Sequence, residues 1–542
     1  MALHAQNTVI AVKKLWPDVI ALTGGTVNAS TVTGLTAVLP ADYYRGGKLK
    51  LLDGNQAGRV YKITANTTSS ITVDRATLTE TGNAVTNSDR VALFNYRSVP
   101  YDQTDEWLLI DNSPSFVPTQ EWEDLYAQRT GGLPYRKDSY LKARPNDITL
   151  EYTFQDAEFL PLIFGQVVDT GTDKGSGGSS TLSATAYAGE NVVSVASAAN
   201  FAADDYIRVG PAASGEIRKI TDVTGTDITL DNSLRRTHAS GVTVIEMDES
   251  EVFTHTFTMH YNDVFRQWPF VIKSLYNAVD HANMLHMFTH YQVGSFTFKN
   301  DGDKLMVSVG LKGYNFSYDH AYYEGAHDGL ANAAVLTDTS ANFYAAGVQV
   351  GMTVYNTTDG SSGTITAVGK TTITATLAGG TESDWDIGDL YYIDVYEAPT
   401  EKTDTPALYY NSEVKINGVV DGVVRTVEAS GDYQAEVRYY HNDYSEGYPS
   451  EVVYKRATNN MNLGVRVDDG KFLSLLLAGS KFDTICKYNL NSAGTHYVTI
   501  TATNNRPNSV PHPFPAGGPI DTDLSMTNQY FTVVVVDDEP YY

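Results

Sequence analysis

The 17 residues from Gly58 to Asp74, GRVYKITANTTSSITVD, recur from Gly215 to Asp231 as GEIRKITDVTGTDITLD. In both copies a Lys-Ile-Thr triplet is followed by a second Ile-Thr pair, eight residues after the first. An aromatic residue, Tyr44 or Phe201, precedes the first isoleucine by 19 positions. Spacing that is kept over so long a stretch indicates an internal duplication.

A third and weaker copy contains Ile365-Thr366 and Ile373-Thr374, with Phe343 upstream. An apolar strand closes each copy, at Val91–Phe94, Val242–Met247 and Leu390–Tyr396. Runs of Thr, Val and Ile that are bounded by Gly, Asn and Asp are typical of short strands and turns. The repeats therefore predict three small β modules of about 70 residues, each a half-open barrel of about five short strands.

The rest of the chain also predicts a mainly β fold, arranged as two similar series of elements. The first series is a strand at Val252–Tyr261, a helix at Val271–Tyr291 and a hairpin at Ser295–Phe316; the second is a strand at Tyr433–Tyr440, a helix at Lys471–Ala478 and a hairpin at Asp483–Asn504. The first helix depends on an apolar stripe at i, i+3 and i+4 spacings. That stripe consists of Leu275, Val279, Ala282, Leu285 and Phe288. A sheet with one helix lying on it accounts for each series.

The charge of the chain excludes one large class of function. The 38 Lys and Arg residues against 64 Asp and Glu give a net charge of −26. Proteins that bind duplex DNA without regard to sequence neutralise phosphates with Lys and Arg, so this chain is not expected to be one. Asp outnumbers Glu by 43 to 21. Both adaptation to high salt and simple avoidance of association through net charge remain open as explanations of the acidity.

Cysteine content and hydropathy exclude three further classes. The lone Cys486 rules out a disulfide framework and a four-cysteine zinc site, and its alternating neighbours predict a buried small residue. The longest apolar run, Val533–Val536, is far shorter than the ~20 residues that cross a bilayer. The start of the sequence lacks the pattern of a signal peptide. We therefore expect a soluble, multidomain protein that is made in a cytoplasm.

No group of residues predicts catalysis. The stretch Gly363–Thr371 resembles a phosphate-binding loop, but it has five residues between its glycines instead of four and a strand pattern follows it, so we predict a hairpin turn. Asn300–Asp303 and Asp468–Gly470 could coordinate calcium, although Asp-Gly pairs between strands are also hairpin signals. Paired carboxylates for glycoside hydrolysis remain an open alternative, because spatial pairing is invisible in a sequence.

Five histidines occur in one region of the chain. His286 and His290 have the i, i+4 spacing that can chelate zinc on a helix, but no Glu follows His286 as the metalloprotease pattern requires. Histidines on a polar face or an interface are the favoured interpretation. The five are His255, His260, His281, His286 and His290. We accordingly predict no enzyme activity, no catalytic residue, no metal ligand and no cofactor.

Three segments resemble the tail tube proteins of tailed viruses. They are Asn411–Gly422 (NSEVKINGVVDG) with the later helix, the closing strand Tyr530–Asp537, and the run Val252–Tyr318. The resemblance lies in the order of strand, helix and hairpin and covers about half the chain. It implies a β-sandwich with a flanking helix, six of which form a ring, with rings that stack into a conduit for the genome.

The resemblance also implies partners and a location. Two tube-like domains in one chain imply a homotrimer with pseudo-sixfold symmetry, whereas a single such domain at Ala407–Tyr542 implies a homohexamer. The rings would stack on one another and on other tail proteins in a virion tail, with no membrane partner. Viral DNA would pass through the lumen without specific binding, since a carboxylate-lined wall repels phosphates. The Asp excess favours an archaeal virus over a bacterial one, and the chain would be made in the host cytoplasm.

Together these patterns predict the following division of the chain. It has an N-terminal arm (1–28), β module 1 (29–96), tube-like domain 1 (97–168 and 250–326), β module 2 inserted into that domain (182–249), β module 3 (327–397) and tube-like domain 2 (398–542), with a flexible Gly/Ser linker at Asp169–Thr181. The modules would point outward and decorate the tube. Two other functions remain open: an adhesin or glycan-binding fibre protein, and a polysaccharide-cleaving virion enzyme.

Overall fold

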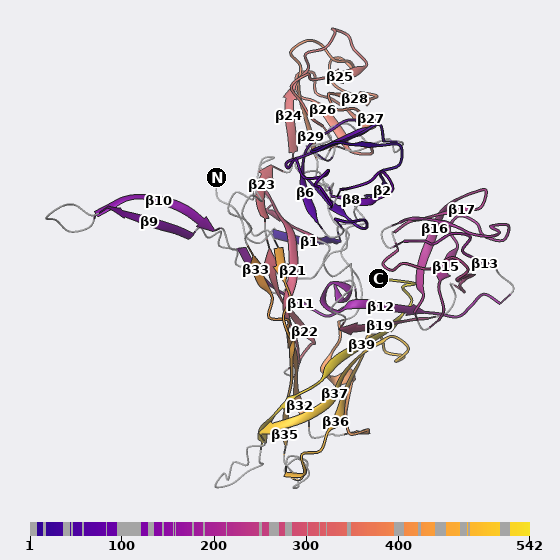
Figure 1. Ribbon diagram of the computed structural model, residues 1–542, viewed down its shortest axis with the longest axis vertical. Coiled ribbons are helices and arrows are strands. Elements are labelled where there is room, and N and C mark those ends of the chain that lie inside the picture. The colour runs from indigo at the N-terminus through magenta and orange to yellow at the C-terminus, as the bar shows by residue number, and fades with distance from the viewer. Residues whose placement is uncertain are drawn as a thin grey trace. The chain divides into compact units, whose positions relative to one another are not determined.

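Figure 1 shows the computed structural model of the chain, which is described here for most of its 542 residues. The described residues are 8–14, 18–35, 44, 47–56, 59–82, 84–94, 121–127, 135–143, 146–155, 157, 159–175, 178–187, 190–212, 214–232, 234–248, 252–259, 270–276, 284–300, 302–313, 315–320, 322–343, 348, 350–394, 406–420, 424–438, 451–466, 474, 477–509 and 521–542. They fall into two compact units. Unit 1 comprises Met1–Trp107, Val271–Met287 and Ser317–Glu401, and unit 2 comprises Leu108–Phe270, Phe288–Phe316 and Lys402–Tyr542.

The described residues are mainly strand, which confirms the predicted fold class. Helical structure among them is limited to short segments, including α1 (Leu160–Phe164) and the 3-10 turn η3 (Tyr409–Asn411). The strands form three small sheets and a larger sheet system, together with the two-stranded pairs β9–β10 (Glu121–Ala127 and Tyr135–Ala143) and β33–β34 (Glu436–Arg438 and Glu451–Val453).

The three small sheets, which we call modules 1, 2 and 3, share one strand order. Module 1 is β2 (Asp18–Ala21), β8 (Arg90–Phe94), β5 (Lys48–Leu51), β6 (Val60–Asn66), β7 (Ser70–Val73), β4 (Thr31–Thr33) and β3 (Thr26–Val27). Module 2 is β13 (Ser179–Thr181), β18 (Thr243–Glu246), β15 (Tyr206–Val209), β16 (Glu216–Thr224), β17 (Asp227–Leu230) and β14 (Val192–Ser194). Module 3 is β24 (Tyr322–Ala326), β29 (Leu390–Asp394), β26 (Thr353–Asn356), β27 (Ser361–Val368), β28 (Thr372–Ala375) and β25 (Val335–Thr337). Apart from the added β3, the spatial order of the strands follows the same pattern along the chain in all three sheets.

The repeated Ile-Thr pairs have a physical cause in this topology. The first isoleucine of each copy (Ile63, Ile220 or Ile365) is fully buried, and the strand register shifts immediately after it. The threonine that follows donates its hydroxyl to the carbonyl of the threonine eight residues later, at 3.1 to 3.2 Å in the three modules. The eight-residue spacing therefore fixes the register of one hairpin, with the isoleucines on the core face.

Each module buries its own apolar core. The upstream aromatic residue of each copy, Tyr44, Phe201 or Phe343, lies in the core of its own module. The sheets begin earlier than predicted, at Asp18, Ser179 and Tyr322, because the first strand of each is short and carries no repeated motif. The predicted linker also begins too early, since Asp169 and Thr170 belong to strand β12 (Gly165–Thr170).

The larger sheet system in unit 2 has two layers that share one long strand. The first layer is β11 (Asn146–Thr153), β22 (Met306–Gly313), β21 (Met284–Asn300), β32 (Val424–Asp432), β35 (Thr458–Arg466) and β38 (Asp521–Thr527). The second is β12, β19 (Phe253–Met259), β39 (Tyr530–Asp537), β37 (Tyr497–Ser509), β36 (Phe482–Asn489), β30 (Ser412–Ile416) and β31 (Val419–Val420). Strand β37 pairs first with β39 and then with β38. The Phe296 and Phe531 rings, one from each layer, lie 6.0 Å apart, as in a β-sandwich.

Strands from the two predicted tube-like domains pair with each other. β19 pairs with β39 over six residue pairs, and β21 pairs with β32 over another six. Tyr433 also donates its hydroxyl to the Ile163 carbonyl at 2.7 Å. The two halves therefore form one continuous sandwich, because backbone hydrogen bonds cross the predicted boundary between them.

The predicted helix at Val271–Tyr291 is wrong for the described residues. Residues Phe270–Tyr276 form β20 and Met284–Asn300 form β21. The apolar stripe that suggested a helix contains valine, leucine and phenylalanine, which also suit strands, and ladder pairing of β21 determines the outcome. Most of the second predicted helix, Lys471–Ala478, lies outside the described residues; Ser474, Leu477 and Ala478 within it are helical.

Candidate functional site

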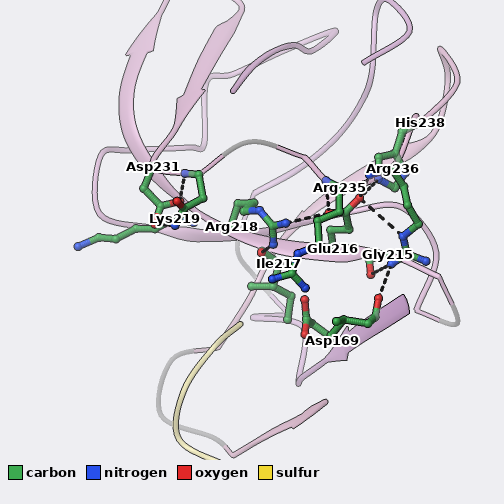
Figure 2. A network of polar contacts seen from close by, with 12 residues as sticks. Asp169, Gly215, Glu216, Ile217, Arg218, Lys219, Asp231, Arg235, Arg236 and His238 are labelled. Carbon is green, nitrogen blue, oxygen red and sulfur yellow. Dashed lines mark hydrogen bonds and ion pairs between the residues drawn. The ribbon is translucent and has the colours of Figure 1, made fainter. Parts of the chain in front are cut away.

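A network of polar contacts in unit 2 surrounds the buried carboxylate of Glu216, the first residue of β16 (Figure 2). Its oxygens accept the backbone N–H groups of Arg235 and Arg236, each at 2.7 Å. The Nε2 atom of His238 lies 3.0 Å from Glu216 Oε1. We call Glu216, Arg218, Arg235, Arg236 and His238 the Glu216 cluster.

Two guanidinium groups balance the charge of Glu216. Arg218 Nη2 lies 2.9 Å from one carboxylate oxygen, and Arg236 Nε lies 3.7 Å from the other. The side chains of Glu216 and Arg218 are each only 1% exposed. Burial by itself raises the pKa of Glu216, but the hydrogen bond with His238 and the charges of Arg218 and Arg236 lower it to about 2. Glu216 is therefore a charged, fully buried carboxylate at neutral pH.

Module 1 holds a counterpart of this ion pair with the charges exchanged. Four positions before the buried isoleucine of the repeat, module 1 has Arg59 where module 2 has Glu216. Arg59 Nη1 lies 2.8 Å from Glu80 Oε2, and both side chains are 45% exposed. The same place in the repeat thus carries a solvated ion pair in module 1 and a buried one in module 2.

The Glu216 cluster is buried because module 2 contacts the end strand of the sandwich. Arg236 Nη2 donates to the Val167 carbonyl of β12 at 2.9 Å. The Asp248 N–H donates to the Thr172 carbonyl at 2.8 Å, and Arg208 forms an ion pair with Asp173 at 2.8 Å. The first contact satisfies one carbonyl of β12, and the other two hold the chain just after this strand, between β12 and module 2.

Apolar contacts complete this junction. Ile217, Met247 and Phe253 are fully buried in one cluster, with Tyr206 and Tyr541 packed against it. Gly171 has no room for a side chain, because a Cβ there would lie 2.6 Å from the Phe253 ring. The chain can therefore pass from β12 into module 2 at this point only with a glycine.

A second buried charge lies beside the first. His255 on β19 faces acceptors with both ring nitrogens: Nδ1 lies 2.8 Å from Asp169 Oδ1, and Nε2 lies 2.8 Å from the Glu539 carbonyl. A neutral imidazole donates from only one nitrogen, so this geometry requires the doubly protonated ring. Burial by itself lowers the pKa of His255, but hydrogen bonds with Asp169 and Asp537 and the charges of both raise it to about 9.

The segment Asp538–Tyr542 lies over these charges. The Tyr541 hydroxyl donates to Asp231 of module 2, and the Tyr542 hydroxyl donates to Asp537 at 2.6 Å. The Tyr542 ring meets the His255 ring edge-on, with centroids 4.8 Å apart. The chemistry of this arrangement is attachment: buried, mutually neutralising charges hold module 2, β12, β19 and the segment after β39 in one geometry.

The other sequence predictions have mixed outcomes. His286 and His290 both lie on β21, so their i, i+4 spacing is that of a strand, with Cα atoms about 13 Å apart, and not that of a helix. His260 and His281 lie outside the described residues. Within the described part of the chain, no group of three or more His, Cys, Asp or Glu side chains is placed to hold a metal ion.

Two predicted turns and one core residue can also be compared with the structure. The stretch Gly363–Thr371 is a strand and turn, with Gly369 N–H donating to the Thr372 carbonyl at 2.7 Å, which confirms the hairpin. Asn300 accepts the Gly302 N–H in the turn between β21 and β22, while Asp468–Gly470 lies outside the described residues. Cys486 is fully buried, as predicted, and burial raises the pKa of its thiol to about 12.

Sequence reasoning missed the Glu216 cluster altogether. One signal was present: among the repeats, the second carries Glu216, Arg218 and the Arg235-Arg236 pair around its motif. Charges of both signs at neighbouring positions of a small β module indicate an ion-pair network, but burial depends on β12, which is distant in the sequence. Among the described residues, no helix is long and apolar enough to span a membrane.

Comparisons with known proteins add no family to these observations. No protein-family model matches the chain, and no curated protein matches it in sequence.

Proposed function

We propose that this chain is a structural subunit of a viral tail tube, in which copies form rings that stack into a conduit for DNA. The observation that carries the proposal is the joining of the two halves by strand pairing, at β19–β39 and β21–β32. In a ring, similar strand pairing between chains would continue the sheets from one copy to the next. The resemblance to tail tube proteins in the sequence of the same strands gives the proposal its particular form.

The second layer presents an open strand edge at its β30 end. At the β12 end, Arg236 of module 2 donates to the Val167 carbonyl. A ring requires the β30 edge of one copy to meet a different surface of the next copy. At the other end β30 pairs with only two residues of β31, Lys415 with Val420 and Ile416 with Val419. Within the described residues, Ser412–Val414 has no strand partner on that side, and Val419 is 62% exposed. An open strand edge beside an exposed apolar residue suits pairing with a second copy.

For the ring we propose a homotrimer with pseudo-sixfold symmetry, the arrangement that the resemblance implies for two strand series in one chain. One chain already supplies both strand series, so three chains supply six. A homohexamer is the arrangement expected if only Ala407–Tyr542 acts as a tube domain. The net charge of −26 suits a lumen that repels DNA, and the modules would face outward.

Negative-stain electron microscopy of the purified full chain tests the proposal. We expect hollow filaments of regular diameter at high protein concentration. A sample that contains only discrete single chains across a range of salt concentrations would overturn it. The variant Glu216→Gln is a useful companion, since it loosens module 2 without changing β30 or β31. Filaments that survive in this variant would assign ring formation to the sandwich rather than to module 2.

An adhesin is the second candidate, because module 3 carries exposed apolar side chains. Leu330, Val350, Ile387 and Leu390 are 80%, 63%, 69% and 57% exposed. We take these four side chains as the candidate binding surface, since a contiguous exposed apolar patch is typical of one. An adhesin would remain a monomer or a simple trimer and would bind host cells or glycans, and substitution of Leu330 and Ile387 by serine would abolish that binding.

A further inference from the structure

We propose that the surface under residues 538–542 is a peptide-binding site, and that the segment Asp-Glu-Pro-Tyr-Tyr fills it as an intramolecular ligand that fastens module 2 to the sandwich. The ligand class is a short acidic peptide with two adjacent tyrosines. This inference is independent of the tail-tube proposal, because every contact lies within unit 2 of one chain.

The first contact site for the segment lies on module 2 and contacts Tyr541. The Tyr541 ring lies 6.3 Å from the Tyr206 ring, and the Arg218 guanidinium lies 5.5 Å from its centroid. The hydroxyl donates to the Asp231 carboxylate. A tyrosine is matched here at three points: its ring by a tilted aromatic ring and by a cation over its face, and its hydroxyl by an anion.

The second contact site lies on the sandwich and contacts Tyr542, which is 5% exposed. Its ring packs against the His255 ring and, at 6.3 Å, against the Phe257 ring, both on β19. Its hydroxyl donates to Asp537 at 2.6 Å. The backbone of the segment is held as well, because the Glu539 carbonyl accepts from the His255 imidazolium.

Two neighbouring residues of one short segment thus contact two different parts of unit 2, module 2 and the sandwich. Tyr541 is held by β15, β16 and the residue after β17, whereas Tyr542 is held by β19 and the end of β39. After Asp537 the described segment forms no strand pairing, and Asp538 and Glu539 are exposed. Recognition therefore depends on side chains and a single carbonyl, as in the binding of a short peptide with two anchor residues.

The experiment uses a full chain and a chain that ends at Asp537, with a fluorescein-labelled peptide Asp-Glu-Pro-Tyr-Tyr as the probe. We expect saturable binding to the shortened chain and at least tenfold weaker binding to the full chain, whose site is filled. The control peptide Asp-Glu-Pro-Phe-Phe lacks both hydroxyls and should bind at least about tenfold more weakly, since each hydroxyl donates to a carboxylate. Equal binding of the two peptides, or no binding at millimolar concentration, overturns the proposal.

A second measurement on full-length variants covers the case in which the shortened chain does not fold. Tyr541→Ala should increase amide hydrogen exchange at least tenfold in β15 and β16 and expose residues 171–175 to protease, while β26 and β27 of module 3 remain unchanged. Excess Asp-Glu-Pro-Tyr-Tyr peptide should restore protection to this variant. Unchanged exchange in Tyr541→Ala, or an increase that is the same in module 3, overturns the proposal.

Discussion

Glu216→Gln is the most informative perturbation of the junction. The substitution keeps the shape of the side chain but removes its charge, and it replaces one acceptor oxygen by an NH2 group that faces the donors from Arg235, Arg236 and His238. It also removes the negative charge that lies 2.9 Å from Arg218 Nη2, a side chain that is 1% exposed. Breaking a buried ion pair in this way costs about 3–5 kcal/mol. The opening equilibrium of module 2 should therefore rise by about 10²- to 4 × 10³-fold.

Native-state hydrogen exchange of the β16 amides measures this opening directly. The matched control is Glu80→Gln in module 1, which removes the carboxylate of the equivalent ion pair where both side chains are 45% exposed. An exposed pair contributes at most about 1 kcal/mol, so exchange in β6 should change by less than about tenfold. Similar increases for the two variants would refute the argument that burial against β12 gives the Glu216 cluster its importance.

Three further predictions concern pH, the separate cores and the sandwich. The pKa of His255 is raised from 6.5 to about 9. Its protonation therefore contributes on the order of 3 kcal/mol to the free energy of unfolding, a contribution that is fully present below pH 6.5 and is lost as the pH rises through 9. Thermal melting of unit 2 should show this loss, and His255→Gln should remove the pH dependence in that range. Ile220→Ala and Ile365→Ala should each cost about 2–5 kcal/mol, with faster hydrogen exchange only in module 2 or module 3 respectively; exchange that increases in both modules would contradict separate cores. Gly431→Ala places a Cβ 2.4 Å from the Phe296 ring and should cost about 1–3 kcal/mol in urea unfolding, and an unchanged midpoint would show that Phe296 moves freely.

The repeat could be read from sequence because its cause is local. Ile63 and Ile71 belong to adjacent strands of one hairpin, so their eight-residue spacing records the register of that hairpin. The hairpin of β36 and β37 was likewise predicted from neighbouring strand and turn residues. The closing strand Tyr530–Asp537 was given by the resemblance, and its bounds agree with those of β39. Pairing between neighbouring strands fixes the spacing of their residues, so it can be predicted from a single sequence.

Features that depend on distant partners were not predictable in this way. The stretch from Val271 to Tyr291 carries apolar residues that satisfy both a helical and an extended period, and only pairing with other strands selects the extended one. The pairing of β19 with β39 joins residues about 280 positions apart, and no local pattern shows it. Burial of Glu216 likewise depends on Val167 of β12, which is 49 positions away in the sequence.

The candidate site was predicted least well of all. Among the five histidines, His255 alone lies in a described network of charges, yet its sequence context of alternating threonines and phenylalanines is that of any strand. Its protonation depends on Asp169 and on the Glu539 carbonyl, which come from β12 and from the segment after β39. The chemistry of such a residue follows from tertiary structure rather than from a motif.

Three-dimensional reconstruction of assemblies of the full chain by electron cryomicroscopy tests the central claim most directly. The proposal predicts hollow tubes of stacked rings, each ring formed by three chains of 59.2 kDa that contribute six strand series around an acidic lumen. Particles that remain single chains at high concentration in both low and high salt, or a trimer that does not stack, would contradict it.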